Sequence, residues 1–159
     1  MSRLAQVAIE YLIIIALAFA ILIPTGYFFY SYSQTSSEGT VKSQINQLGS
    51  KMLSNAQSIY GLGEGSLVTL EFNYPSNIRD VYILNQNELI ISYEVSTGLN
   101  DAVFFSKVPI SGPYNYSSAA PCSPLPCNNS QFGVNKPYQG NHVLKFESRT
   151  SYVLINLTQ

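Results

Sequence analysis

The sequence predicts an α+β protein in which a long N-terminal hydrophobic α-helix precedes a small antiparallel β-sandwich-like domain. The helix is predicted by residues 11–30, which contain no charged side chain. The β domain is predicted by residues 66–157, where short runs rich in Val, Ile, Tyr and Phe alternate with turn residues. The 159 residues suffice for one ordinary domain and one additional element. We expect a short N-terminal leader segment at 1–5, a helix over 6–60 and an outer β domain over 61–159.

The helix begins with a segment that can cross a membrane. Residues 11–30 would extend about 30 Å as a helix, the thickness of the hydrocarbon layer. The aromatic side chains typical of a membrane boundary follow at Tyr27, Phe28, Phe29, Tyr30 and Tyr32. Arg3 is the one basic side chain before the segment, so the positive-inside rule places residues 31–159 outside the cell. An ordinary secretory signal is the alternative, but its small-residue cleavage site, Ala18-Phe19-Ala20, would fall inside the apolar run.

The residues before this segment carry a motif, Gln6-Val7-Ala8-Ile9-Glu10-Tyr11-Leu12. It resembles the class III signal peptide of archaeal type IV pilin-like proteins. The resemblance implies that a prepilin-type membrane aspartic peptidase cuts between Ala5 and Gln6 and removes residues 1–5. It also implies a homo-oligomeric helical filament at the cell surface, built from a membrane-inserted precursor by an assembly ATPase and a membrane platform protein. The β domain would then be the pilin domain. Ala8 and Ala5 stand where this family often has Ser and Gly.

Glu10 is a carboxylate at the head of an apolar helix. Ionisable residues within membrane helices are functional by default. The resemblance places Glu10 and Tyr11 in subunit assembly, where Glu10 would pair with the amino group that cleavage creates at Gln6. The alternative is that Glu10 only marks the end of the membrane segment.

A second, amphipathic part of the helix is expected after the Ser- and Thr-rich residues 31–39, which are weakly helical. Apolar residues recur at helical spacing on one stripe, formed by Val41, Ile45, Leu48, Met52, Leu53, Ala56 and Ile59. We expect this stripe to pack on its own domain, with a neighbouring subunit as the alternative. The helix should stop at Gly61-Leu62-Gly63. These glycines follow a helix and precede a strand, so they do not form a nucleotide-binding loop.

The outer domain should contain six strands, at 67–73, 80–84, 88–95, 102–108, 142–147 and 152–157. Residues 148–151 would close a hairpin between the last two. Residues 110–141 break the pattern because they are rich in Pro, Ser, Gly, Asn and Tyr. This loop contains both cysteines, Cys122 and Cys127, which in an exported segment favour a disulfide. Free thiols or a metal site are alternatives, although one Cys pair and His142 do not provide the four ligands of a zinc site.

Three glycosylation sequons begin at Asn115, Asn128 and Asn156. The first two lie in the irregular loop, where a glycosyltransferase could reach them. Asn156 lies near the end of an expected strand and is the weaker candidate.

Composition and motifs exclude several function classes. Charged residues make up 11% of the chain and the net charge is −1, which argues against a nucleic-acid partner. With one His and no nucleophile beside a base at recognisable spacing, we expect no enzyme, no catalytic residue, no cofactor and no metal. Two classes remain. One is a filament subunit, with adhesion as its expected role. The other is a single-span protein that holds an extracellular binding or adhesion domain and does not polymerise.

Overall fold

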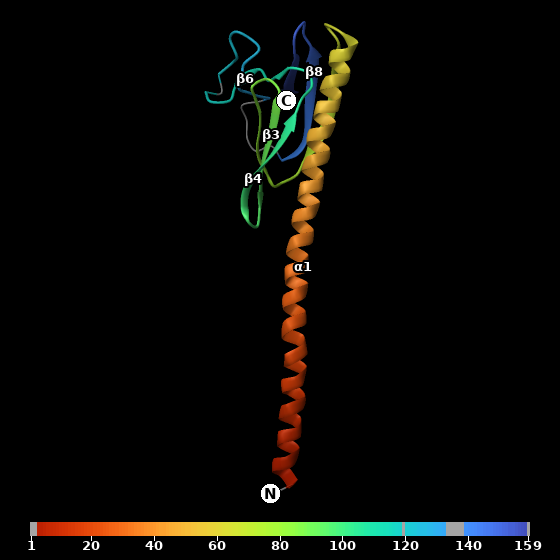
Figure 1. Ribbon diagram of the computed structural model, residues 1–159, viewed down its shortest axis with the longest axis vertical. Helices are drawn as coiled ribbons and strands as arrows, with labels where there is room; N and C mark the ends of the chain where they lie inside the picture. The colour runs from red at the N-terminus through yellow and green to blue at the C-terminus, as the bar shows by residue number, and fades with distance from the viewer. Residues whose placement is uncertain (1–2, 119, 133–138, 159) are drawn as a thin grey trace. The chain divides into compact units, whose positions relative to one another are not determined.

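The structure is a computed structural model that describes residues 3–118, 120–132 and 139–158 (Figure 1). The side chains of residues 3–8, 34, 35 and 37 also lie outside the described part. The chain divides into two compact units, one ending at Gly39 and the other beginning at Thr40. The described part of the first unit is helical throughout. The second contains the end of the same helix and all the strands.

The helix α1 (Arg3–Leu62) is longer than the sequence predicts. It continues past Pro24 and through the Ser- and Thr-rich residues 31–39. Helix formation is cooperative, so good helix formers on both sides can carry a weak stretch. The helix ends where expected, because Gly63 has a φ of 96° and its N–H donates to the Tyr60 carbonyl oxygen at 3.2 Å. A left-handed glycine at this position is a common helix stop.

The apolar stripe of α1 packs on its own domain, as predicted. Ile45, Leu48, Met52, Leu53, Ala56 and Ile59 are all buried, and Val41 packs at the margin of the same core. The core also takes residues from both β-sheets, among them Phe72, Ile83, Ile91 and Phe146. One continuous core therefore joins the end of α1 to the strands of the second unit.

The strands form two sheets. The strand bounds are β1 (Leu67–Tyr74), β2 (Ile78–Leu84), β3 (Glu88–Val95), β4 (Gly98–Phe105), β5 (Ile110–Ser111), β6 (Tyr114–Asn115), β7 (Ser130–Gln131), β8 (Gly140–Ser148) and β9 (Val153–Thr158). One sheet has the order β1-β8-β9-β5 and the other the order β4-β3-β2-β7-β6. All pairs are antiparallel except β5 with β9. The predicted α+β class is confirmed, and so is the hairpin of β8 and β9.

Two parts of the strand prediction differ from the structure. The sequence predicts a strand over 102–108, but β4 starts at Gly98 because only Ser96 and Thr97 form the turn after β3. The sequence also predicts no strand within 110–141 before His142. The short strands β5, β6 and β7 lie there, and β8 begins at Gly140. Two-residue strands are too short to show an alternating pattern.

Candidate functional site: the apolar helix and the disulfide loop

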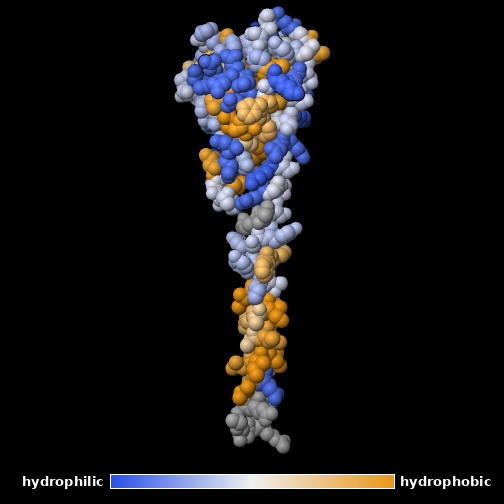
Figure 2. Space-filling view, viewed as in Figure 1, coloured by the Kyte–Doolittle hydropathy of each residue, from blue (hydrophilic) through white to orange (hydrophobic). Residues whose placement is uncertain are grey.

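The first candidate site is the apolar segment of α1. Every residue from Ile9 to Ser33 is exposed, including Leu12, Ile13, Phe19, Leu22, Ile23 and Phe29. By length and composition, α1 contains a stretch that could cross a membrane. Figure 2 shows hydrophobic residues along the visible side of this segment. A helix that is apolar all round needs an apolar environment, and this chain does not provide one within the described residues.

Glu10 is the one charged residue between Ile9 and Ser33, and its side chain is exposed. No ion pair within the described side chains includes it. Tyr11, next in the chain, is 68% exposed. Ala5 and Gln6, the predicted cleavage residues, belong to α1, but their side chains lie outside the described part.

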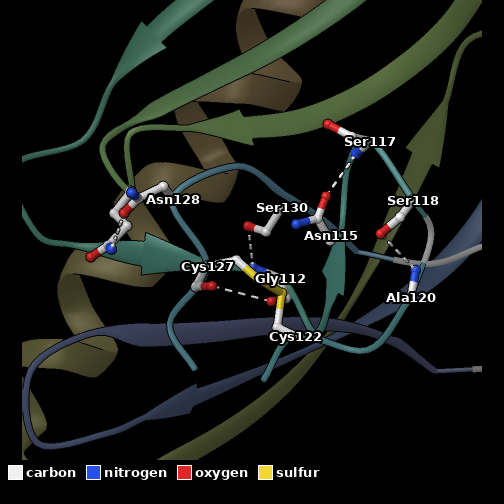
Figure 3. Close-up of a disulfide and its surroundings, with 11 residues drawn as sticks. Gly112, Asn115, Ser117, Ser118, Ala120, Cys122, Cys127, Asn128 and Ser130 are labelled. Carbon is white, nitrogen blue, oxygen red and sulfur yellow. Dashed lines mark hydrogen bonds between the residues drawn. A yellow bond between two sulfur atoms is a disulfide. The ribbon is translucent and has the colours of Figure 1, made fainter. Parts of the chain in front are cut away.

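The second candidate site is the disulfide loop, shown in Figure 3. Cys122 and Cys127 form the expected disulfide, with their Cα atoms 5.8 Å apart. The loop is fixed at its base, where the Cys122 N–H donates to the Pro113 carbonyl oxygen at 2.8 Å. The Gly112 N–H donates to the Ser130 hydroxyl at 2.7 Å, which joins the start of the loop to β7. The described part of the segment is therefore hydrogen-bonded into the second sheet. Residues 119 and 133–138 lie outside the described part.

A pair of stacked tyrosines connects the loop to β2, the central strand of the second sheet. The Tyr116 ring stacks on Tyr82 of β2, with ring centroids 4.2 Å apart and planes 20° from parallel. The Tyr116 hydroxyl donates to the carboxylate of the buried Asp80 at 3.3 Å. Burial raises the pKa of Tyr116, and the negative charge of Asp80 raises it further. The neutral tyrosine is therefore the form that the folded loop favours.

The three sequon asparagines differ in exposure. Asn128 is exposed, and its side-chain oxygen accepts a hydrogen bond from Gln86 at 3.0 Å. Asn115 is half-buried in β6 and accepts from the Ser117 N–H at 2.9 Å. Asn156 is half-buried in β9, opposite Lys145 of β8. Exposure therefore favours Asn128 as the sequon that an enzyme can reach, and glycosylation stays a prediction for all three.

His142 lies within β8 rather than at its start. Its Nε2 is 3.2 Å from the Gln139 carbonyl oxygen, and its ring meets Tyr74 edge to face at 5.2 Å between centroids. Within the described residues, no three His, Cys, Asp or Glu side chains form a cluster that could hold a metal ion.

A third feature had no counterpart in the sequence analysis. An open groove of about 420 Å³ lies between α1 and the end of β1, within the second unit. Leu48, Phe72 and Pro75 line it, together with polar residues that include Gln44, Gln47 and Lys51. The helical spacing of 44, 47, 48 and 51 indicates a shared face, but no sequence pattern indicates that β1 flanks it.

Comparison of the chain with protein-family models, with curated proteins and with solved structures finds no match.

Proposed function

We propose that this chain is a structural subunit of an archaeal type IV pilus-like surface filament. It would enter the membrane as a precursor, lose residues 1–5 to a prepilin-type peptidase and assemble through α1. The observation that carries the proposal is a helix exposed and apolar on all sides from Tyr11 to Phe29, headed by the single charge of Glu10. The motif from Gln6 to Leu12 stands directly before it.

Burial of this segment supplies the cohesion of the filament. In a bundle of such helices, the apolar side chains of neighbouring subunits surround one another instead of lipid. Lipid tails are as apolar as leucine, so leaving the membrane gains mainly tighter packing. Because packing alone provides little driving force for leaving the membrane, extraction of the helix needs a further energy source. This requirement fits the assembly ATPase that the resemblance implies.

Glu10 sets the axial register in this proposal. A charge at the centre of a membrane helix costs about 2.5–3.5 kcal/mol on insertion scales. Cleavage after Ala5 places a new amino group four residues before Glu10. At about 4 Å and an effective dielectric constant near 20, a carboxylate and an ammonium attract by about 4 kcal/mol. The attraction and the cost nearly cancel, so the pair adds little net stability. A helix that slides would lose the pair and leave the charge buried alone.

The second unit would face outward as a sandwich-like pilin domain. Three features support an external position: the disulfide Cys122–Cys127, the exposed sequon at Asn128 and the low overall charge. Adhesion is the role we propose for this outer surface.

Electron microscopy of native cells, with and without the gene for this chain, tests the proposal. We expect surface filaments whose subunits, identified by mass spectrometry, include this chain, and we expect those filaments to disappear on deletion. Recovery of the chain only as a dispersed membrane protein would contradict the proposal. That result would support the single-span anchor, because the same apolar helix serves both functions.

A further inference from the structure

The strand β4 forms one edge of the second sheet. It is the terminal strand of that sheet, and among the described residues it pairs with β3 alone. The outward row of β4 carries Leu99, Val103 and Phe105, which are 66%, 47% and 70% exposed. Proteins usually protect such edges with lysine, proline or a bulge. The only charge in this row is Asp101, and its carboxylate accepts a hydrogen bond from Ser92 at 2.5 Å.

The groove beside α1 is a recess of suitable size for one of these side chains. Its volume of about 420 Å³ can take an aromatic ring. Leu48 and Phe72, 6% and 2% exposed, form its closed floor, so the apolar contact would come from the half-buried Pro75 and the aliphatic stem of Lys51. Its polar residues include the long side chains of Gln44 and Gln47. The Lys51 ammonium lies 5.1 Å from the centre of the Phe72 ring, and no carboxylate in the described part of the chain forms an ion pair with it.

The groove and β4 lie against opposite flanks of α1. The groove is on the side of Gln47 and Lys51. The Phe104 ring of β4 packs so closely against Gly49 that a Cβ at Gly49 would lie 2.5 Å from it. Two residues along a helix correspond to about 200°, so Gly49 is about 160° around α1 from both Gln47 and Lys51. Phe105 also points away from the face that carries Phe104. Phe105 therefore cannot fill the groove of its own chain.

The charges beside Phe105 and at the groove are also of opposite sign. Glu88 is directly opposite Phe105 in the pairing of β3 with β4. Among the described residues, no ion pair includes Glu88. A ring of Phe105 seated in a groove would bring Glu88 toward the Lys51 of that groove, and opposite charges at an interface fix orientation.

We propose that Phe105 of one copy docks into the groove of a second copy, with Glu88 of the first facing Lys51 of the second. We call the exposed ring of Phe105 the knob. Because the knob and the groove are different surfaces, the contact is head-to-tail and leaves one knob and one groove open for the next copy. Repeated contacts of this kind form an open chain rather than a closed dimer. The inference deepens the proposed filament function and rests on it for its biological role.

Cross-linking of the full-length chain in detergent micelles tests the contact. One variant carries Lys107→Cys beside the knob and a second carries Gln47→Cys at the groove. Both positions are exposed, and Cys122 and Cys127 are already paired. With a short bis-maleimide, the mixture should give a cross-linked dimer at least tenfold above the Lys107→Cys and Ser151→Cys control mixture. Adding Phe105→Ser to the first variant should lower the yield about tenfold, as for a central aromatic residue of an interface.

A charge exchange supplies the second readout. Lys51→Glu on the groove variant should lower the yield, and Glu88→Lys on the knob variant should restore it. Glu64→Lys, the same charge change at an exposed turn residue, should not restore it. A mixture that cross-links no better than the control overturns the inference, as does dimer formation by Lys107→Cys alone, which would indicate β4 pairing with β4. Cross-linking in micelles does not require filament assembly, so its result is independent of the electron microscopy. Filaments without the cross-link refute only the inference. The cross-link without filaments refutes only the proposed function.

Discussion

Substitution of Gly112 by alanine should destabilise the second unit. Gly112 is buried between β5 and β6, beside the strand β7. A Cβ at this position would lie 2.1 Å from the Gln131 carbonyl oxygen and 2.5 Å from the carbonyl carbon. Both atoms belong to the backbone of β7, so no side-chain rotation can relieve the overlap. The strand must move, and the hydrogen bond from Gly112 to Ser130 would be strained or lost.

The cost follows from these two effects. Overpacking of a well-packed interior costs about 1–3 kcal/mol, and loss of a hydrogen bond adds about 0.5–1.5 kcal/mol. We expect the free energy of unfolding to fall by about 2–4 kcal/mol. For a unit of this size, 1 kcal/mol corresponds to about 4 °C, so the melting temperature should fall by about 8–16 °C.

Thermal unfolding of the detergent-solubilised chain, followed by near-ultraviolet circular dichroism of the tyrosines, measures this change. Gly61→Ala is the matched control, because a Cβ there meets nothing within 4 Å and the position is helical. Alanine in place of glycine within a helix gains up to about 1 kcal/mol, so this variant should melt at or above the wild-type temperature. A Gly112→Ala protein that melts like the wild type would refute the close approach of Gly112 to β7.

Three further predictions concern the loop and the helix. Combined Cys122→Ser and Cys127→Ser should lower the free energy of unfolding by about 2 kcal/mol, because the closed loop is short. Limited proteolysis of this variant should show new cleavage within residues 113–131 with the long strands still protected, and an unchanged cleavage pattern would contradict it. The pKa of Tyr116 is raised above 10.0 by burial and by Asp80, so the folded state holds this proton more tightly than the unfolded state. Its stabilising contribution is complete below pH ~10 and is lost as pH rises through the folded pKa. Urea unfolding of Tyr116→Phe should therefore show a weaker loss of stability above pH ~10 than the wild type. Equal losses in the two proteins would count against this assignment. Glu10→Ala should insert and be cleaved but enter filaments poorly when expressed alone, and wild-type filament yield with normal subunit spacing would make Glu10 a boundary marker only.

Local periodicity predicts much of this fold. The stripe from Val41 to Ile59 repeats at helical spacing, and its burial in the structure follows that pattern. In β1, Leu70 and Phe72 face inward while Glu71 is exposed, as alternation requires. The stop at Gly63 and the hairpin between β8 and β9 are likewise encoded by neighbouring residues. The disulfide could be predicted because the loop contains the only two cysteines.

The rest depends on contacts between distant residues. β7 forms a strand because Ser130 and Gln131 pair with Ile83 and Tyr82 of β2, far away in the sequence. β5 pairs in parallel with β9, an arrangement that no local turn announces. The groove needs β1 beside one flank of α1, and Phe105 becomes a knob only because β4 is a sheet edge. Chain periodicity specifies which face of an element is apolar, but not which neighbour covers it.

The N-terminal peptide of the mature chain shows whether the chain is processed as a filament subunit. Filaments sheared from native cells should be purified, digested and analysed by mass spectrometry. We expect the chain in those filaments to begin at Gln6, with or without cyclisation to pyroglutamate, and to retain the apolar segment from Tyr11 to Tyr30. A chain that begins at Met1, Ser2 or Ile21 would contradict prepilin-type processing and with it the proposed filament subunit.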